Sequence, residues 1–205
     1  MVHGERLNVV THLAGTVLAL CGSAILILLA ARGGDPWKVV SVSVYGAMLS
    51  ALYAISALYH GTRGPAKDIM RKMDHCAIYL LIAGSYTPFT LVTLRGGLGW
   101  SLFGTIWGLA AVGIAQEIWL ARGPRISSLV IYLAMGWLAL GAIVPLSALL
   151  SRTGLAWLIA GGVVYTIGIV FYALDKRIPH GHGVWHLFVL GGSACHYSAI
   201  AFHVL

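Results

Sequence analysis

Seven long apolar segments follow one another along the chain, separated by short stretches rich in Gly, Pro and charged residues. Each segment has about twenty residues, the length that an α-helix needs to cross roughly 30 Å of hydrocarbon. The predicted spans are residues 8–31, 38–60, 74–94, 99–121, 126–149, 154–174 and 182–204. The pattern predicts an all-α, polytopic membrane protein in which residues 1–205 form a single seven-helix transmembrane domain.

The composition agrees with this pattern and excludes several classes of function. Of the 205 residues, 59% are hydrophobic and only 9% are charged, which is not the composition of a soluble domain. The connections between spans are too short to contain a second domain. The formal net charge of +7 therefore indicates membrane topology and not nucleic-acid binding, because no soluble basic domain is available to bind nucleic acid.

The positive residues divide unevenly between the two ends of the predicted bundle. One end has nine: Arg6, Arg63, Lys67, Arg71, Lys72, Arg122, Arg125, Lys176 and Arg177. The other end has four: Arg32, Lys38, Arg95 and Arg152. Because Lys and Arg are enriched on the cytoplasmic side of membrane proteins, the N-terminus is predicted to be cytoplasmic. An odd number of spans then places the C-terminus outside.

Polar residues far apart in the sequence meet at one depth on this topology. His182 and His186 begin the seventh span and lie four residues apart, so both project from one helix face and could hold one metal ion. His60 ends the second span at the same level, and Asp74 begins the third. Ser56 precedes His60 by four residues and shares its helix face. Ionisable groups within spans are costly, which makes this cluster a candidate functional site.

Three imidazoles with an open fourth position are typical of a catalytic zinc site. Zinc lowers the pKa of a bound water to about 7 and polarises a carbonyl oxygen. In that case Asp74 could accept the proton of the water or hold it in place, and Ser56 could orient a ligand or an oxyanion. The reaction that such a site supports is hydrolysis.

Other interpretations of the polar residues remain open at this level. Histidines at a membrane edge often face lipid headgroups or water without binding a metal. Glu5, Asn8 and His12 form a stripe at the inner end of the first span, where they could cap the helix or support the metal ligands from behind. His196 and His203 lie deeper in the last span and are predicted to pack between helices and not to conduct protons.

Four spaced motifs resemble those of the bacterial hemolysin III proteins, and they occur in the same order: Glu5–His12, Ser56–His60, Met73–His75 running into Gly84–Pro88, and His182–His186 with His196. These proteins belong to the progestin and adiponectin receptor (PAQR) superfamily, whose site also resembles that of the alkaline ceramidases. The likeness covers nearly the whole chain. It implies a seven-helix protein of the bacterial plasma membrane with a cytoplasmic N-terminus.

The resemblance also implies a site and a set of functions. Zinc would be held by His60, His182 and His186, with Asp74 near the metal and Ser56 close by. Animal members of the superfamily are associated with hydrolysis of the amide of ceramide, and the bacterial name comes from cytolytic activity. The leading hypothesis is a zinc-dependent hydrolase acting on an amide or ester of a membrane lipid whose acyl chain lies in the bundle. The alternatives are a zinc-stabilised sensor or regulator of membrane state, and a pore-forming protein.

Overall fold

The computed structural model describes residues 5–120, 126–175 and 177–205. This part of the chain is helical and contains no strand. Its elements are α1 (Arg6–Arg32), α2 (Pro36–Gly61), α3 (Ala66–Pro88) with the π-helix η1 (Phe89–Thr93), α4 (Gly97–Trp119), α5 (Ile126–Gly136), the 3-10 helix η2 (Leu138–Ala142), α6 (Ile143–Leu149), α7 (Arg152–Ala173) and α8 (Gly181–His203). Since α5 to α6 together occupy one predicted span, the prediction of seven helical spans is confirmed.

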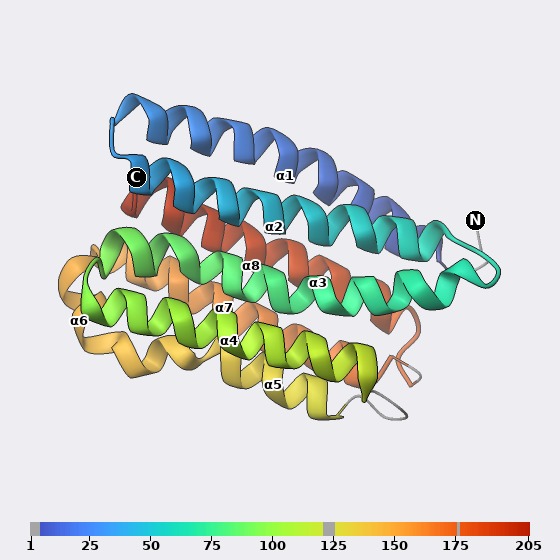
Figure 1. Cartoon of the computed structure of the whole chain (residues 1–205). Helices are drawn as coiled ribbons and strands as arrows, with labels where there is room; N and C mark the ends of the chain where they lie inside the picture. The colour runs from blue at the N-terminus through green and yellow to red at the C-terminus, as the bar shows by residue number, and fades with distance from the viewer. Residues whose placement is uncertain (1–4, 121–125, 176) are drawn as a thin grey trace.

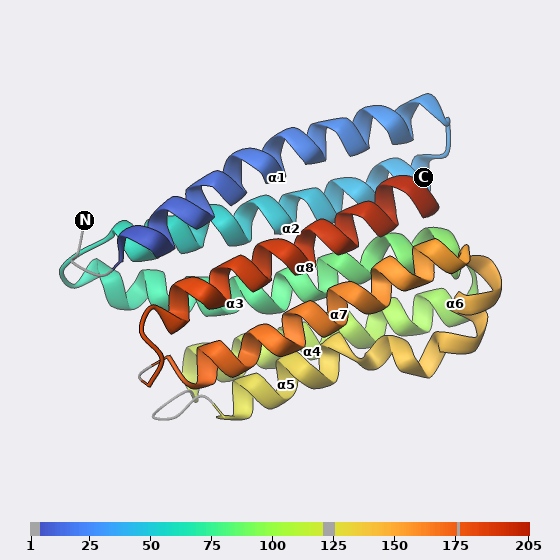
Figure 2. The ribbon, with the colours of Figure 1, turned by 180° about the vertical axis from the view of Figure 1, so that it is seen from behind.

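Six of these spans are long and apolar enough to cross a membrane: α1, α2, α3 with η1, α4, α5 to α6, and α7. The seventh, α8, is 23 residues long and is not among them. It contains His182, His186, His196 and His203, which lower its mean hydropathy. It packs against α1 and α7 (Figure 2), and His186 and Ser193 on its surface are buried in the protein.

The helices form a ring in chain order. Each helix packs against its neighbours in the sequence, α5 contacts α7, and α8 closes the ring against α1. Figure 1 shows that the N-terminus lies at one end of this bundle and the C-terminus at the other. The start of α1, the end of α2, the start of α3 and the start of α8 all lie at the N-terminal end. This arrangement brings together the polar residues that the sequence placed at one depth.

Several helix boundaries follow from local sequence. Asp35 caps α2 by accepting a hydrogen bond of 2.9 Å from the Trp37 amide, with Pro36 in the first turn. Ser151 caps α7 in the same way, through the Gly154 amide. The third helix begins at Ala66, eight residues before the predicted start at residue 74. Its first two turns are polar and extend α3 beyond the apolar segment, which is why hydropathy alone placed the start too late.

The predicted fifth span, residues 126–149, is broken and not continuous. Gly136 ends α5, and the chain then forms a 3-10 turn before α6, whose Pro145 cannot donate a helix hydrogen bond. Tyr86 of α3 satisfies backbone groups freed by the break. Its hydroxyl accepts from the Ala139 amide at 2.9 Å and donates to the Met135 carbonyl at 2.8 Å. Inside a membrane such groups need a protein partner, because no water reaches them.

A second buried polar cluster joins α3, α4 and α5. Glu117 of α4 is 1% exposed, and its carboxylate lies 3.4 Å from His75 Nδ1. The Ser128 hydroxyl donates to the same carboxylate at 3.3 Å. The Tyr132 hydroxyl donates to the His75 carbonyl at 2.9 Å. A carboxylate buried this deeply requires such contacts, so the cluster holds α4 and α5 against α3 beside Asp74.

Candidate metal centre

Three histidines from two helices come together at the end of the ring where the chain begins. His60 lies in the last turn of α2, and His182 and His186 lie one turn apart at the start of α8. One ligand nitrogen from each ring lies within 4.8 Å of the other two. His60 and His186 are each only 2% exposed. This group of histidines could hold a metal ion.

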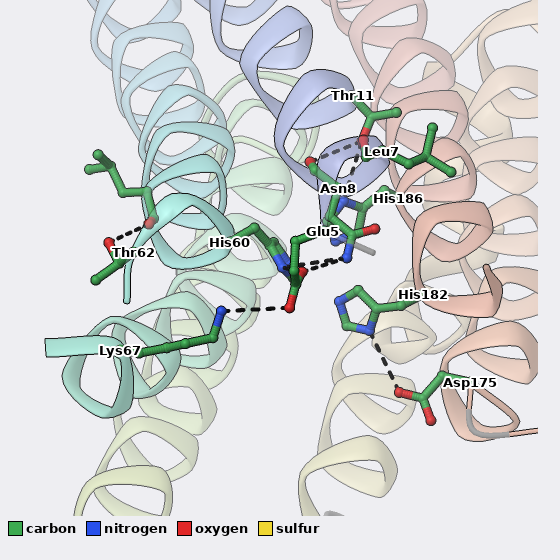
Figure 3. A network of polar contacts seen from close by, with 11 residues as sticks. Glu5, Leu7, Asn8, Thr11, His60, Thr62, Lys67, Asp175, His182 and His186 are labelled. Atoms are coloured by element: carbon green, nitrogen blue, oxygen red, sulfur yellow. Dashed lines mark hydrogen bonds and ion pairs between the residues drawn. The ribbon is translucent and has the colours of Figure 1, made fainter. Parts of the chain in front are cut away.

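Each of the three imidazoles contacts an oxygen atom through Nδ1. The pairs are His60 with Glu5 Oε2, His186 with Thr11 Oγ1 at 3.4 Å, and His182 with Asp175 Oδ2 at 3.7 Å (Figure 3). Metal-binding histidines almost always make such a contact, since it fixes the tautomer and directs the other nitrogen to the metal. Within the described residues, that other nitrogen of His60, Nε2, is buried without a hydrogen-bond partner. A metal ion would satisfy it.

Glu5 connects α1 to this group and does not cap the helix. It occupies the N-cap position of α1, but its side chain makes no capping hydrogen bond, so that interpretation is wrong. The carboxylate instead contacts His60 Nδ1, accepts a hydrogen bond of 2.9 Å from Asn8 Nδ2 and lies 3.5 Å from Lys67 Nζ (Figure 3). Burial alone would raise the pKa of Glu5. The hydrogen bonds with Asn8 and His60 and the charge of Lys67 outweigh this effect, so the pKa of Glu5 lies below its ordinary value.

His12 lies directly against the group from the side of α1. Its ring stacks on that of His186 with centroids 3.6 Å apart and planes 10° apart, and it meets Tyr53 edge-on at 5.1 Å. Its side chain is 3% exposed, and both ring nitrogens are buried without a hydrogen-bond partner among the described residues. His12 therefore limits the movement of the His186 ring.

Ser56 and Asp74 line one cavity together with His182 and His186. Ser56 lies one turn before His60 on α2 and is 2% exposed, and Asp74 on α3 is 9% exposed. The sequence placed both residues at the level of the histidines, and the structure places both in the lining of the same cavity. An acid and a hydroxyl beside three imidazoles can take part in proton transfer and in hydrogen bonding to a ligand.

A family model described as haemolysin-III related matches residues 1–197. The chain belongs to the haemolysin III-related family. Hemolysin-3 of Bacillus cereus is 43% identical over 205 residues, which cover 100% of this chain and 93% of that protein. The hemolysin-3 homolog of Bacillus subtilis (strain 168) is 42% identical over 200 residues, 97% of this chain and 93% of that protein. Monocyte to macrophage differentiation factor of Homo sapiens is 32% identical over 200 residues, 94% of this chain and 81% of that protein.

These matches confirm the family resemblance seen in the motifs. Together with the apolar helices, they make this haemolysin III-related protein a multi-pass membrane protein.

Sequence reasoning missed three residues that contact the candidate centre of this haemolysin III-related protein. Thr11 lies three residues after Asn8 on the same stripe of α1, and this spacing could have identified it. Asp175 lies in the connection between α7 and α8, and its contact with His182 depends on how the chain turns there. Lys67 lies on the early turns of α3, which the hydropathy pattern excluded from the helix.

The two deeper histidines lie outside the candidate centre. His196 meets the Tyr165 ring edge-on at 5.4 Å and packs closely against Gly161 of α7. His203 Nδ1 lies 2.8 Å from the Ser151 hydroxyl at the opposite end of the bundle. Both make the contacts expected of residues that pack between helices.

Proposed function

We propose that this protein is an intramembrane zinc-dependent hydrolase that cuts an amide or ester bond of a membrane lipid. The observation that carries the proposal is the set of Nδ1 contacts. All three histidines use Nδ1 for an oxygen, which leaves Nε2 of His60, His182 and His186 as the nitrogen available to one ion beside a mainly apolar cavity. Zinc bound there would polarise the carbonyl of the scissile bond and lower the pKa of a water.

The remaining residues have roles that follow from their positions. Asp74 accepts a proton from the attacking water and returns it to the amine or alcohol that leaves, as a general base and then a general acid. The Ser56 hydroxyl donates a hydrogen bond to the lipid carbonyl oxygen as negative charge develops on it. Glu5 and Asn8 hold the ring of His60, and His12 supports the ring of His186 from its face. The acyl chain of the lipid occupies the apolar part of the cavity.

Metal content and turnover test the two parts of this proposal separately. Protein purified in detergent is expected to contain about one zinc per chain by mass spectrometry, and His60→Ala and the double variant His182→Ala/His186→Ala are expected to lose it. His203→Ala is the matched control, since it removes an imidazole of the same helix at the far end. Asp74→Asn is expected to keep the zinc and to lose release of fatty acid from lipid amides and esters.

Two results would contradict the proposal. Absence of metal from the parent protein even after zinc is supplied would show that the three histidines do not form a metal centre. Undiminished hydrolysis by both His60→Ala and Asp74→Asn would show that the reaction takes place elsewhere. A zinc-loaded parent that hydrolyses no lipid amide or ester would instead support the alternative of a zinc-stabilised regulator of membrane state. In that case the metal holds α2 and α8 together, and no bond is broken.

A further inference from the structure

The ring of helices encloses two neighbouring cavities. The first begins at the candidate metal centre and has a volume of about 110 Å³, and the second has a volume of about 60 Å³. On this measure one water needs roughly 10–15 Å³, so both are several times larger than a water site. Six residues line both cavities, and they mark the place where the two meet: Ser85, Tyr86, Gly136, Trp137, Gly162 and His196.

The chemistry of the lining changes along this path. Ser56, Asp74 and His182 lie at one end of the first cavity, whereas the far end of the second is formed by Leu94 and Leu146. A ligand that suits such a path has a polar group at one end and a hydrocarbon chain at the other. That is the description of a single acyl chain with its carbonyl at the metal centre.

The distance to the junction follows from α3, which contributes to both ends of the first cavity. Asp74 and Tyr86 are twelve positions apart on this helix, which corresponds to about 18 Å at 1.5 Å per residue. With C–C bonds of about 1.5 Å, a straight saturated chain advances roughly 1.25 Å per carbon, so about 14 carbons reach the junction from the level of Asp74.

The indole of Trp137 is fixed at this junction from two sides. Its Nε1 donates a hydrogen bond of 3.0 Å to Thr166 Oγ1 on α7. Its backbone lies at the break after α5, two residues before the Ala139 amide that Tyr86 holds. Gly162 faces it across the junction, and a Cβ atom placed on Gly162 would lie 3.7 Å from the Trp137 ring. The Trp137 indole therefore limits the space at the junction, and the space that remains is open because Gly162 has no side chain.

We propose that Trp137 and Gly162 set the length of the acyl chain that this protein binds. The choice of an acyl chain as occupant rests on the proposed function, whereas the length limit rests on the junction of the two cavities. Removing the indole joins the cavities and admits longer chains. Adding a side chain at Gly162 narrows the junction and restricts binding to shorter ones.

The test is binding of a series of free fatty acids, from decanoate through myristate, palmitate and stearate to docosanoate. Purified full-length protein in detergent is titrated with each, and bound fatty acid is counted by native mass spectrometry. In the parent protein, each added methylene is expected to tighten binding roughly fourfold up to about myristate, with no further gain at stearate. Trp137→Ala is expected to extend the gain and to bind docosanoate about tenfold more tightly than the parent does.

Two further variants make the test independent of any loss of folding in Trp137→Ala. Gly162→Leu is expected to move the limit towards decanoate. Trp107→Ala is the matched control, because the Trp107 indole also bonds a threonine, Thr87, yet lines neither cavity. It is expected to keep the parent profile.

The inference is overturned if the parent binds none of these fatty acids. It is also overturned if Gly162→Leu and a folded Trp137→Ala both keep the parent length profile. Hydrolysis is measured separately, so a shifted profile in a protein without turnover would reject the hydrolase and keep the length limit.

Discussion

At the scale of single residues, the contacts of the histidines decide which nitrogen can bind a metal. A neutral imidazole has one donor and one acceptor nitrogen. The Thr11 hydroxyl donates to the Leu7 carbonyl at 2.8 Å, so towards His186 Nδ1 its oxygen can only accept. An ionised Glu5 carboxylate also only accepts, from His60 Nδ1. Both rings therefore have the proton on Nδ1 and a lone pair on Nε2, which is the form that a metal requires.

Removing the charge of Glu5 should lower the affinity for the metal without removing a metal ligand. Glu5→Gln keeps the shape of the side chain but offers an amide that can donate to His60 Nδ1 and favour the wrong tautomer. Loss of such outer contacts typically lowers metal affinity by about 10–100-fold, and we expect a loss in this range. Competition with a chelator of known affinity measures it. The control is Asp68→Asn, at the same end of the bundle, whose exposed carboxylate pairs with Arg71. Equal metal affinity in Glu5→Gln and the parent would show that the Glu5 contact has no such role.

At the scale of helices, the pattern of apolar and polar residues predicted those features that depend on a single segment of the chain. The number of spans follows from the length of apolar runs, and the shared face of His182 and His186 follows from helix periodicity. The break after Gly136 could not be predicted in this way, because the hydroxyl that bonds its backbone groups belongs to Tyr86 on α3, far away in the sequence. The contact of Asp175 with His182 could not be predicted either, because it depends on how the connection between α7 and α8 places Asp175.

The broken span should be sensitive to one hydroxyl group. Tyr86→Phe leaves the Ala139 amide without its partner in a region that water does not reach, which typically costs about 1–3 kcal/mol. We expect the midpoint of thermal unfolding in detergent to fall by about 2–4 °C for each kcal/mol lost. Tyr197→Phe is the control, since the Tyr197 hydroxyl only adds a second hydrogen bond to the Gly22 carbonyl inside α1. A midpoint for Tyr86→Phe equal to that of Tyr197→Phe would mean that the break satisfies its own backbone groups.

At the scale of the whole molecule, the ring places the candidate metal centre and the apolar cavities in series between the two ends of the bundle. Glu5, His60 and Lys67 contact one another where α1 begins, α2 ends and α3 begins, which is the end of the bundle where the N-terminus lies (Figure 1). Lys38, at the start of α2, bonds the carbonyl of the C-terminal residue Leu205. A lipid carbonyl at the centre would then lie near one membrane surface while its chain extends through the bundle. Which surface this is depends on topology.

The uneven distribution of Lys and Arg predicts that the candidate metal centre lies at the cytoplasmic surface, and fusions to reporter proteins can test this. Alkaline phosphatase is active only outside the cytoplasm, whereas green fluorescent protein fluoresces when it folds inside. With the N-terminus inside and seven helices, a fusion after Leu205 is expected to give active phosphatase and no fluorescence. A fusion in the connection after Gly61, beside His60, is expected to give the reverse, and it serves as the internal control. Fluorescence after Leu205 with phosphatase activity after Gly61 would place the centre at the outer surface. The centre would then take its metal from outside the cell and act on lipids of the other leaflet.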